Sequence, residues 1–340
     1  MKPRHIPIRE AWLRLREEAP VDPAQPIIDA HHHLWDKPGS LYLLDEILAD
    51  MASGHNVVAT VFVEGKEGYL SDAPPKLRPL GETRLVAGIA EAGDERSGGE
   101  RRVAAGIVGF VDLMLGDEAG ELLDLHANAG KGRLRGVRNA TAWHADPEAR
   151  GSVLNHPPGQ LYAPEMRRGL FELQRRGLVF DAWMYHTQLG DLADLAYAMP
   201  ELPIVINHIG GPVGIGPYQG RREEVYEDWR HFMRKLSGYQ NTTVKLGGLG
   251  MLMTGFDFQD RPAPPSSDDL ADAWGPYMNQ CIEAFGPHRC MFESNFPVDK
   301  GTASYGVLWN AFKKITAGYS STERHSLFFG TANRVYGLGL

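Results

Sequence analysis

Short apolar runs alternate with longer amphipathic stretches along most of this chain. Where the apolar residues are contiguous and often β-branched, as in Asn56 to Val63, the pattern predicts a buried strand. Where they recur every three or four residues it predicts a helix, and Gly177 and Pro200 mark helix ends. The predicted strands are 27–33, 56–63, 102–111, 133–138, 178–184, 204–208, 242–246 and 290–293.

A predicted helix follows each predicted strand. These helices are 41–53, 78–92, 117–130, 163–177, 188–199, 221–237, 268–285 and 304–317, with one more at 322–336. The alternation fits a (β/α)8 TIM barrel, because parallel strands buried on both faces are uniformly apolar. We therefore predict an N-terminal arm at 1–26, with a short helix at 8–18 and a proline-rich lead-in, and one barrel domain at 27–340.

Composition and charge narrow the kinds of partner. The net charge of −8 and the lack of a long basic stripe argue against nucleic acid. No run of eighteen apolar residues could span a membrane, and the start of the chain lacks the apolar core of a signal peptide. The two cysteines suit a reducing compartment. We expect a cytoplasmic enzyme with a small-molecule substrate, and a homodimer only from the general frequency of two-fold assemblies.

The clearest chemical signal is the stretch 27–35, in which an apolar strand runs into three histidines. His31 and His33 are two residues apart, so their side chains point to the same side if the strand continues through them. An affinity tag also clusters histidines, but a tag would not follow an Ile-Ile-Asp strand. The pair could hold a metal ion or contact a substrate carbonyl.

Polar residues also end later strands. His186 follows the fifth predicted strand, His208 ends the sixth, and 293–295 end the eighth. The C-terminal ends of barrel strands meet on one face, where barrel enzymes assemble their active sites. A lone histidine at a strand end is usually structural, whereas polar groups at four strand ends on one face indicate catalysis.

Five motifs stand in a fixed order along the chain. They are Ile-Ile-Asp-Ala-His-His-His-Leu-Trp-Asp at 27–36, Gly-Val-Arg at 136–138, Ile-Asn-His-Ile-Gly-Gly-Pro at 206–212, Lys-Leu-Gly-Gly-Leu at 245–249 and Met-Phe-Glu-Ser-Asn-Phe-Pro-Val at 291–298. Together they resemble the amidohydrolase superfamily, in particular its branch of 2-pyrone-4,6-dicarboxylate lactonase and sugar-lactone hydrolases. The resemblance implies a (β/α)8 hydrolase that opens a small carboxylated or polyhydroxy lactone with activated water.

The resemblance also bears on cofactors. It implies a divalent metal ion such as zinc or manganese, for which His31, His33 and His186 are the expected ligands. Some members of this branch work without a metal, so metal-independent catalysis stays open. In either case the histidines would polarise the ester carbonyl, on whose oxygen negative charge develops in the transition state.

One position departs from the family pattern. Relatives usually carry Gly-Ser-Asp-Trp-Pro after the eighth strand, with the aspartate as general base, and Asn295 stands at that position here. An amide cannot accept a proton near neutral pH. The alternative bases are Glu293, which would share the side of Asn295 on a regular strand, Asp299 from the following loop, and His186 or His208. Glu293 is favoured because a strand places a side chain more rigidly than a loop.

Four more residues near strand ends are candidate substrate contacts. Arg138 could clamp a carboxylate, or form a structural salt bridge. Lys245 could polarise a carbonyl, or pair with Glu293 as a buried ion pair. Glu64 could line the pocket or partner a histidine of the first strand, and Tyr185 could form an apolar wall or belong to the core.

Two other functions are compatible with the pattern. A zinc-dependent decarboxylase or a lactone isomerase on the same barrel would be consistent with the missing aspartate. A ligand-binding barrel without activity would also explain Asn295, but four retained histidines argue against it. Ring opening and carbon dioxide release distinguish the enzymatic alternatives.

Overall fold

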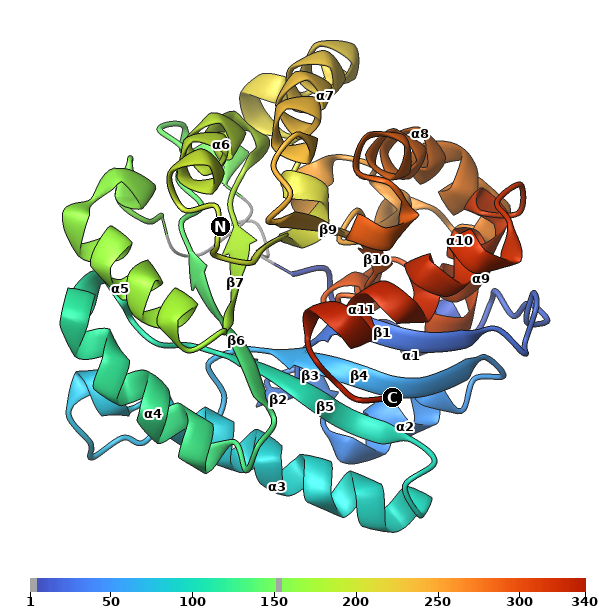
Figure 1. The fold of residues 1–340 in the computed structure, drawn as a ribbon. Coiled ribbons are helices and arrows are strands. Elements are labelled where there is room, and N and C mark those ends of the chain that lie inside the picture. The colour runs from blue at the N-terminus through green and yellow to red at the C-terminus, as the bar shows by residue number, and fades with distance from the viewer. Residues whose placement is uncertain (1–4, 151–154) are drawn as a thin grey trace.

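The computed structural model describes residues 5–150 and 155–340. The first four residues of the predicted arm, and 151–154 in the loop after the fourth predicted strand, lie outside the described residues. Eight strands pair in parallel and in chain order, with helices between them (Figure 1). The strands are β1 (Pro26–His32), β4 (Asn56–Val63), β5 (Arg102–Gly109), β6 (Leu134–Ala140), β7 (Val179–Trp183), β8 (Ile204–Ile206), β9 (Thr242–Leu246) and β10 (Cys290–Phe292).

The two edges of this sheet meet just beyond β10. The backbone N–H of Asn295 donates to the carbonyl of His31 at 2.9 Å, and the N–H of His33 donates to the carbonyl of Phe296 at 2.7 Å. His32 and Phe296 form a parallel bridge between these bonds. The sheet is therefore a nearly closed barrel, which confirms the predicted (β/α)8 fold.

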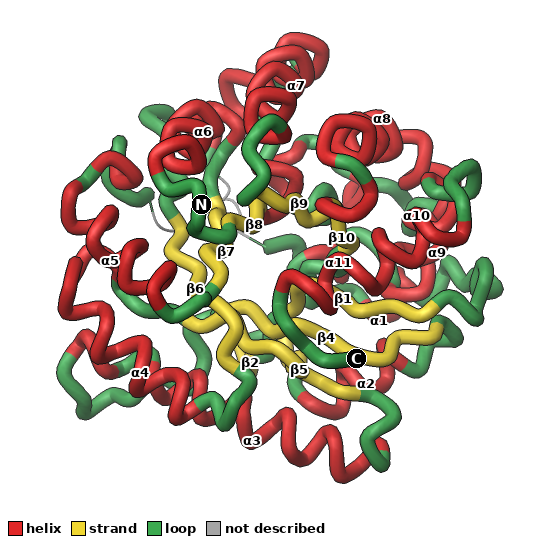
Figure 2. Tube along the Cα trace, in the orientation of Figure 1, coloured by secondary structure: helices red, strands yellow, loops and turns green. Residues whose placement is uncertain are grey.

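Helices surround the barrel on its outside (Figure 2). Those that follow the eight strands are α2 (Leu44–Met51), α3 (Leu80–Ser97), α4 (Ala119–Ala129), α5 (Pro164–Arg175), α6 (Leu189–Ala198), α7 (Arg222–Ser237), α8 (Ser267–Phe285) and α9 (Tyr305–Ile315). Gly177, predicted as a helix stop, adopts a left-handed φ of 63° shortly after α5.

Several predicted helices differ from the observed ones. The helix predicted at 8–18 is limited to α1 (Glu10–Leu13), and the helix predicted at 78–92 extends to Ser97. The helix predicted at 322–336 is divided into α10 (Ser321–His325) and α11 (Thr331–Val335), with a π-helical turn between them. Helix ends and π-turns depend on packing that periodicity does not report.

A hairpin that the sequence analysis missed follows β1. Strand β2 (Trp35–Lys37) pairs antiparallel with β3 (Ser40–Tyr42), and Gly39 makes the turn with a φ of 75°. The helix predicted at 41–53 therefore begins only at Leu44. Strands of three residues are too short to show an alternating pattern. The hairpin places the indole of Trp35 against the ring of His33.

Apolar side chains fill the barrel and the layer between barrel and helices. Inside the barrel, small and β-branched residues such as Ala30, Val61 and Val205 pack together. The N-terminal segment lies against the loops that follow β9, where the indole of Trp12 donates to the carbonyl of Arg261. Among the helices of the described residues, none is both long enough and apolar enough to cross a membrane.

Candidate active site

The histidine strand β1 presents its side chains in alternation, as predicted. His31 and His33 face each other edge to face, with ring centroids 4.9 Å apart. His32 points the other way, where its Nε2 lies 2.9 Å from the hydroxyl of Thr60. All three rings are buried, and burial lowers the pKa of His32 to about 3. His32 is therefore a neutral structural residue, while His31 and His33 belong to the site.

The ring of His33 has a defined orientation. Its Nδ1 lies 2.8 Å from the carbonyl of Val63, which can only accept, so Nδ1 carries the proton. The neutral ring therefore turns a lone pair at Nε2 toward Nε2 of His31, 3.3 Å away. The indole of Trp35 stacks on His33 with ring centroids 5.0 Å apart and holds it in place. His33 thus presents a hydrogen-bond acceptor or metal ligand.

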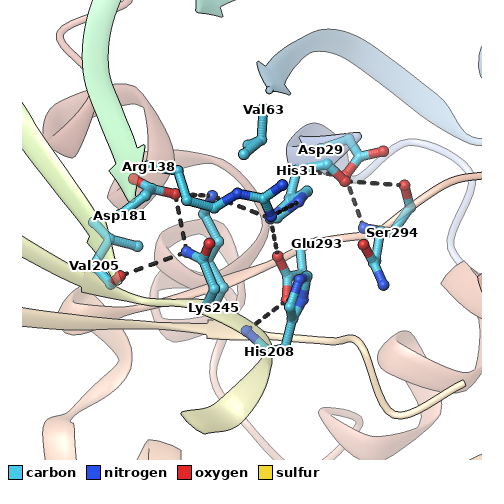
Figure 3. Close-up of polar contacts among 12 residues, drawn as sticks. Asp29, His31, Val63, Arg138, Asp181, Val205, His208, Lys245, Glu293 and Ser294 are labelled. Atoms are coloured by element: carbon cyan, nitrogen blue, oxygen red, sulfur yellow. Dashed lines mark hydrogen bonds and ion pairs between the residues drawn. The ribbon is translucent and has the colours of Figure 1, made fainter. Parts of the chain in front are cut away.

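Glu293 lies between two histidines, as Figure 3 shows. Its Oε1 accepts a 2.7 Å hydrogen bond from Nδ1 of His208 and a 3.0 Å bond from the backbone N–H of the same residue. Its Oε2 lies 2.9 Å from Nδ1 of His31. A fully buried carboxylate is thus shared by imidazoles from β1 and from the end of β8.

The predicted placement of Glu293 and Asn295 on one side of a regular strand is wrong. Strand β10 ends at Phe292, and Asn295 has a left-handed φ of 55°, so Glu293 and Asn295 do not share one side of a regular strand. Glu293 faces the histidines, whereas the side chain of Asn295 donates to Asp299.

Backbone geometry positions His208. Strand β8 ends at Ile206, and His208 follows in the left-handed region with a φ of 51°. Gly248, after β9, lies so close that a Cβ there would be 2.6 Å from the ring of His208. Next to it, a Cβ on Gly247 would be 2.4 Å from Cγ of Glu293. The two glycines let the backbone after β9 press directly on the Glu293–His208 pair.

Arg138, near the end of β6, is anchored by Glu64. Its Nε donates to Oε1 of Glu64 at 2.9 Å, and its Nη2 donates to the carbonyl of the same residue at 2.7 Å. Its Nη1 lies 3.4 Å from Nε2 of His31. Glu64 therefore partners Arg138 rather than a histidine of β1, and the guanidinium brings a positive charge to His31.

Lys245 is also paired, but its partner is not the expected one. Its Nζ donates to Oδ2 of Asp181 at 2.6 Å, and both side chains are fully buried. The predicted alternative of a Lys245–Glu293 ion pair is wrong. Lys245 pairs with Asp181 in β7, and Glu293 pairs with two histidines. Nζ also lies 3.5 Å from Nδ1 of His31.

Burial and these charges keep His31 and His33 neutral. The pKa of His31 lies well below its usual range, mainly because the ring is buried and also because Lys245 is close. The pKa of His33 is likewise lowered by burial and by Arg138. Neutral imidazoles retain the lone pairs that a metal ion or an N–H or O–H donor requires.

Asn295 and Asp299 form a buried pair beside this cluster. Nδ2 of Asn295 donates to Oδ1 of Asp299 at 2.8 Å, and Oδ2 of Asp299 accepts from the N–H of Gly250 at 3.0 Å. Burial raises the pKa of Asp299 to about 8 even though both donors favour its carboxylate form. Asp299 is therefore anchored, not free to swing in from the loop.

His186 and Tyr185 lie toward the loops over the barrel. Nδ1 of His186 accepts a 3.2 Å bond from the N–H of Val213, and its ring contacts Tyr218 edge to face at 5.1 Å. Tyr185 is fully buried and packs with Val213. Within the described part of the chain, no hydrogen bond, ion pair or ring contact joins His186 to His31 or His33, so its role as a third ligand stays a prediction.

Sequence reasoning missed several residues that support the site. Asp181 neutralises Lys245, and the ring of Trp183 contacts that of His208 edge to face at 4.8 Å. Buried Glu82 accepts from two backbone N–H groups next to Glu64. Asp181 did leave a signal, since it is the single acid within an otherwise apolar strand. Glu82 left none, because acidic residues are common in helices.

One group of described residues could hold a metal ion together. Ligand atoms of His31, His208 and Glu293 all lie within 4.8 Å of one another. Oε2 of Glu293 is buried, and despite its closeness to His31 it makes no well-formed hydrogen bond, so an acceptor is left for a cation. Imidazole and carboxylate are ligands of zinc and manganese, and the residues therefore fit such an ion. Arg138 and Lys245 both lie near His31, and their positive charges oppose the binding of a cation there.

A (β/α)8 barrel with histidines and a carboxylate at the C-terminal ends of its strands has the arrangement of a barrel enzyme's active site. The chain belongs to the amidohydrolase family, whose sequence model matches residues 28–338. It is 34% identical to the uncharacterized protein y4mH of Sinorhizobium fredii, over 91% of this chain and 98% of that protein.

Two further relatives come from Burkholderia multivorans. The chain is 27% identical to an L-fucono-1,5-lactonase, over 92% of this chain and 96% of the lactonase. A solved amidohydrolase with bound zinc has a TM-score of 0.70 and 24% identity, and the superposition covers 92% of this chain and 99% of that one. The similarity to the solved structure supports the barrel fold.

Proposed function

We propose that this enzyme hydrolyses a small lactone, opening the ring to the hydroxy acid with water. The observation that carries the proposal is the buried Glu293 carboxylate held between His31 and His208. A carboxylate that accepts from Nδ1 of an imidazole is the arrangement that orients a histidine base and stabilises its protonated form. Asn295 therefore does not leave the site without a base.

His208 is the base in this proposal. Its Nδ1 donates to Glu293, so Nε2 keeps its lone pair and can take a proton from the attacking water. As the ring opens, the same nitrogen returns the proton to the leaving oxygen. Glu293 compensates the positive charge that develops on His208. The pair replaces the base that the family resemblance had placed at position 295.

The carbonyl oxygen becomes negative as water adds, and positive charge is close by. Nη1 of Arg138 and Nζ of Lys245 approach the two ring nitrogens of His31 from either side. Their partners Glu64 and Asp181 fix them, so little reorganisation accompanies the reaction. A divalent ion held by His31 and by Oε2 of Glu293 would supply Lewis acidity at the same place when bound, and would leave Oε1 to His208.

One relative supports a choice of substrate class. An L-fucono-1,5-lactonase covers almost the whole chain at 27% identity, which favours a hydroxylated sugar-acid lactone. Glu64 and Asp181 already compensate the charges of Arg138 and Lys245. Neither cation is therefore available to form an ion pair with a substrate carboxylate. We therefore place uncharged polyhydroxy lactones ahead of carboxylated ones.

The direct test follows acid release and the NMR spectrum of L-fucono-1,5-lactone and of 2-pyrone-4,6-dicarboxylate with the purified enzyme. Ring opening well above the spontaneous rate is expected, with the sugar lactone preferred. Release of carbon dioxide from aromatic acids without any lactone opening would overturn the proposal in favour of a decarboxylase. Conversion of one lactone into another without acid would favour an isomerase.

The metal is tested separately, by elemental analysis of protein purified without an affinity tag. We expect about one divalent ion per chain, zinc or manganese, with activity lost on chelation and restored by that ion. Full lactone opening by metal-free protein would instead assign carbonyl polarisation to His31, His33 and Arg138 themselves.

A further inference from the structure

Asn295 is fixed in an unusual backbone position beside the histidine strand. It adopts a left-handed φ of 55°, and its N–H donates to the carbonyl of His31 at 2.9 Å. Its side chain is almost completely buried. The residue therefore sits directly against the catalytic cluster, and the direction of its amide decides whether it offers a donor or an acceptor.

Asp299 determines that direction. Oδ1 of Asp299 accepts from Nδ2 of Asn295, and Oδ2 accepts from the N–H of Gly250. The N–H of Asp299 in turn donates to the carbonyl of Asn295 at 3.2 Å. A Cβ on Gly250 would lie 2.9 Å from Cγ of Asp299, so the carboxyl group has no room to turn on that side. Oδ1 can accept the amide N–H whether or not the acid is ionised.

With its NH2 group engaged, Asn295 has only its carbonyl oxygen left to offer. Among residues 5–150 and 155–340, the hydrogen bond that the side chain of Asn295 makes is the one from Nδ2 to Asp299. A nearly buried acceptor without a protein partner is expected to bind a hydroxyl group or water.

We propose that Asp299 is a positioning residue that acts through Asn295, presenting the amide oxygen as the acceptor for a substrate hydroxyl group. This inference rests on the proposed lactone hydrolysis and extends it, because it makes Asn295 the residue that distinguishes a hydroxylated lactone from an unsubstituted one. A site built to bind a hydroxyl discriminates strongly against an analogue that lacks it.

The Asp299→Asn variant reverses the amide of Asn295. The amide introduced at position 299 would use its oxygen for the N–H of Gly250 and its NH2 for position 295, so Asn295 must turn its oxygen inward and its NH2 toward the substrate. We expect kcat/KM for L-fucono-1,5-lactone to fall about tenfold or more, mainly through KM, while kcat/KM for δ-valerolactone changes less than about threefold. An equal loss on both lactones, or no loss on either, would overturn the inference.

The exchanged variant Asn295→Asp/Asp299→Asn is the matched control. In this variant the side-chain NH2 at position 299 donates to the carboxylate at position 295, so the bond between the two side chains is restored in the reverse direction. The side-chain oxygen at position 299 still accepts from the N–H of Gly250. Position 295 again offers an oxygen to the substrate. We expect preference for the hydroxylated lactone to return to within about fivefold of the wild-type protein. Failure of the exchange to restore that preference in a folded protein would contradict the pairing.

A second readout does not depend on activity. In thermal unfolding, each single variant should lower Tm and the exchanged variant should recover most of the loss, because the two side chains are coupled. If the wild-type enzyme opens no lactone while this coupling is found, the proposed function fails and the positioning of Asn295 stands. Additive losses of Tm would remove the structural basis of the inference.

Discussion

Charged side chains inside the barrel are compensated one by one. Lys245 is fully buried and is neutralised by Asp181, which also accepts from Asn207 and from the hydroxyl of Tyr336. Arg138 is compensated by Glu64, and Glu293 by two imidazoles. Each ion is tied to a partner from another strand or from the residues just after one, so the site is pre-organised by ion pairs whose loss is costly.

The Asp181→Asn variant tests this compensation. It keeps the shape of the side chain but leaves the ammonium of Lys245 buried without its counter-charge. We expect the free energy of unfolding to fall by about 3–5 kcal/mol in urea titrations. The control is Asp268→Asn, which breaks the exposed ion pair with Lys314 and should cost at most about 1 kcal/mol. Equal effects of the two substitutions would contradict the account.

Glu82 makes stability depend on pH. Burial, reinforced by the neighbouring Glu64, raises its pKa from 4.5 to about 8. Between these two pH values the folded protein keeps the proton of Glu82, whereas the unfolded chain has released it. The contribution of Glu82 to stability is therefore fully present below about pH 4.5 and is lost as the pH rises through 8. Glu82→Gln keeps the acceptor for the N–H groups of Gly65 and Glu67 without titrating.

We expect the wild-type Tm to fall relative to that of Glu82→Gln between pH 5 and pH 9, measured by thermal unfolding at constant ionic strength. The exposed Glu95→Gln serves as control and should leave the slope unchanged. A Tm difference between wild type and Glu82→Gln that is constant across this range would show that Glu82 does not titrate as described.

At the scale of elements, the backbone after β9 packs directly against the side chains of the site. Gly247, Gly248 and Gly250 press against Glu293, His208 and Asp299 in turn, and any Cβ there would come within 3 Å of the partner. The backbone can approach this closely only because these positions lack a side chain. The Lys-Leu-Gly-Gly-Leu motif is therefore a packing surface for Glu293 and His208, the pair proposed to be catalytic.

Gly248→Ala tests that surface. The new methyl group would push the ring of His208 away from Glu293, so kcat/KM should fall about 100-fold or more. The matched control is Gly132→Ala, which has a similar left-handed φ of 76° but nothing within 4 Å. Both variants should lose about 1–2 kcal/mol of stability from the strained backbone, and only Gly248→Ala should lose activity. Comparable activity of the two variants would contradict this packing role of the segment after β9.

Single elements also show where sequence reasoning fails. The strands ending at Ile206 and Phe292 were predicted to run further, because nothing in the sequence reports that His208 and Asn295 turn into the left-handed region. The hairpin of β2 and β3 was missed because its strands are too short for a pattern. Both failures lie beside the active site, where local preference is subordinate to function.

At the scale of the whole molecule, the barrel was predictable, and most site residues could be placed at strand ends. The alternation of apolar runs with helical stretches indicates the number and order of the parallel strands, and their C-terminal ends must meet. The pairing of side chains was not predictable, since Lys245 with Asp181 and Glu293 with His31 and His208 depend on distances across the barrel. The predicted ligand set of His31, His33 and His186 came from the family resemblance, and the place of His186 in it stays a prediction.

The central claim is that Glu293 and His208 act as one unit in opening a lactone. The measurement that tests it most directly is kcat/KM of His208→Asn, Glu293→Gln and the double variant on the sugar lactone, with Tm confirming that each is folded. We expect each single variant to lose about 10²–10⁴-fold and the double variant to be no worse than His208→Asn alone within about threefold. Losses that multiply in the double variant, or a His208→Asn enzyme of nearly wild-type activity, would contradict the account.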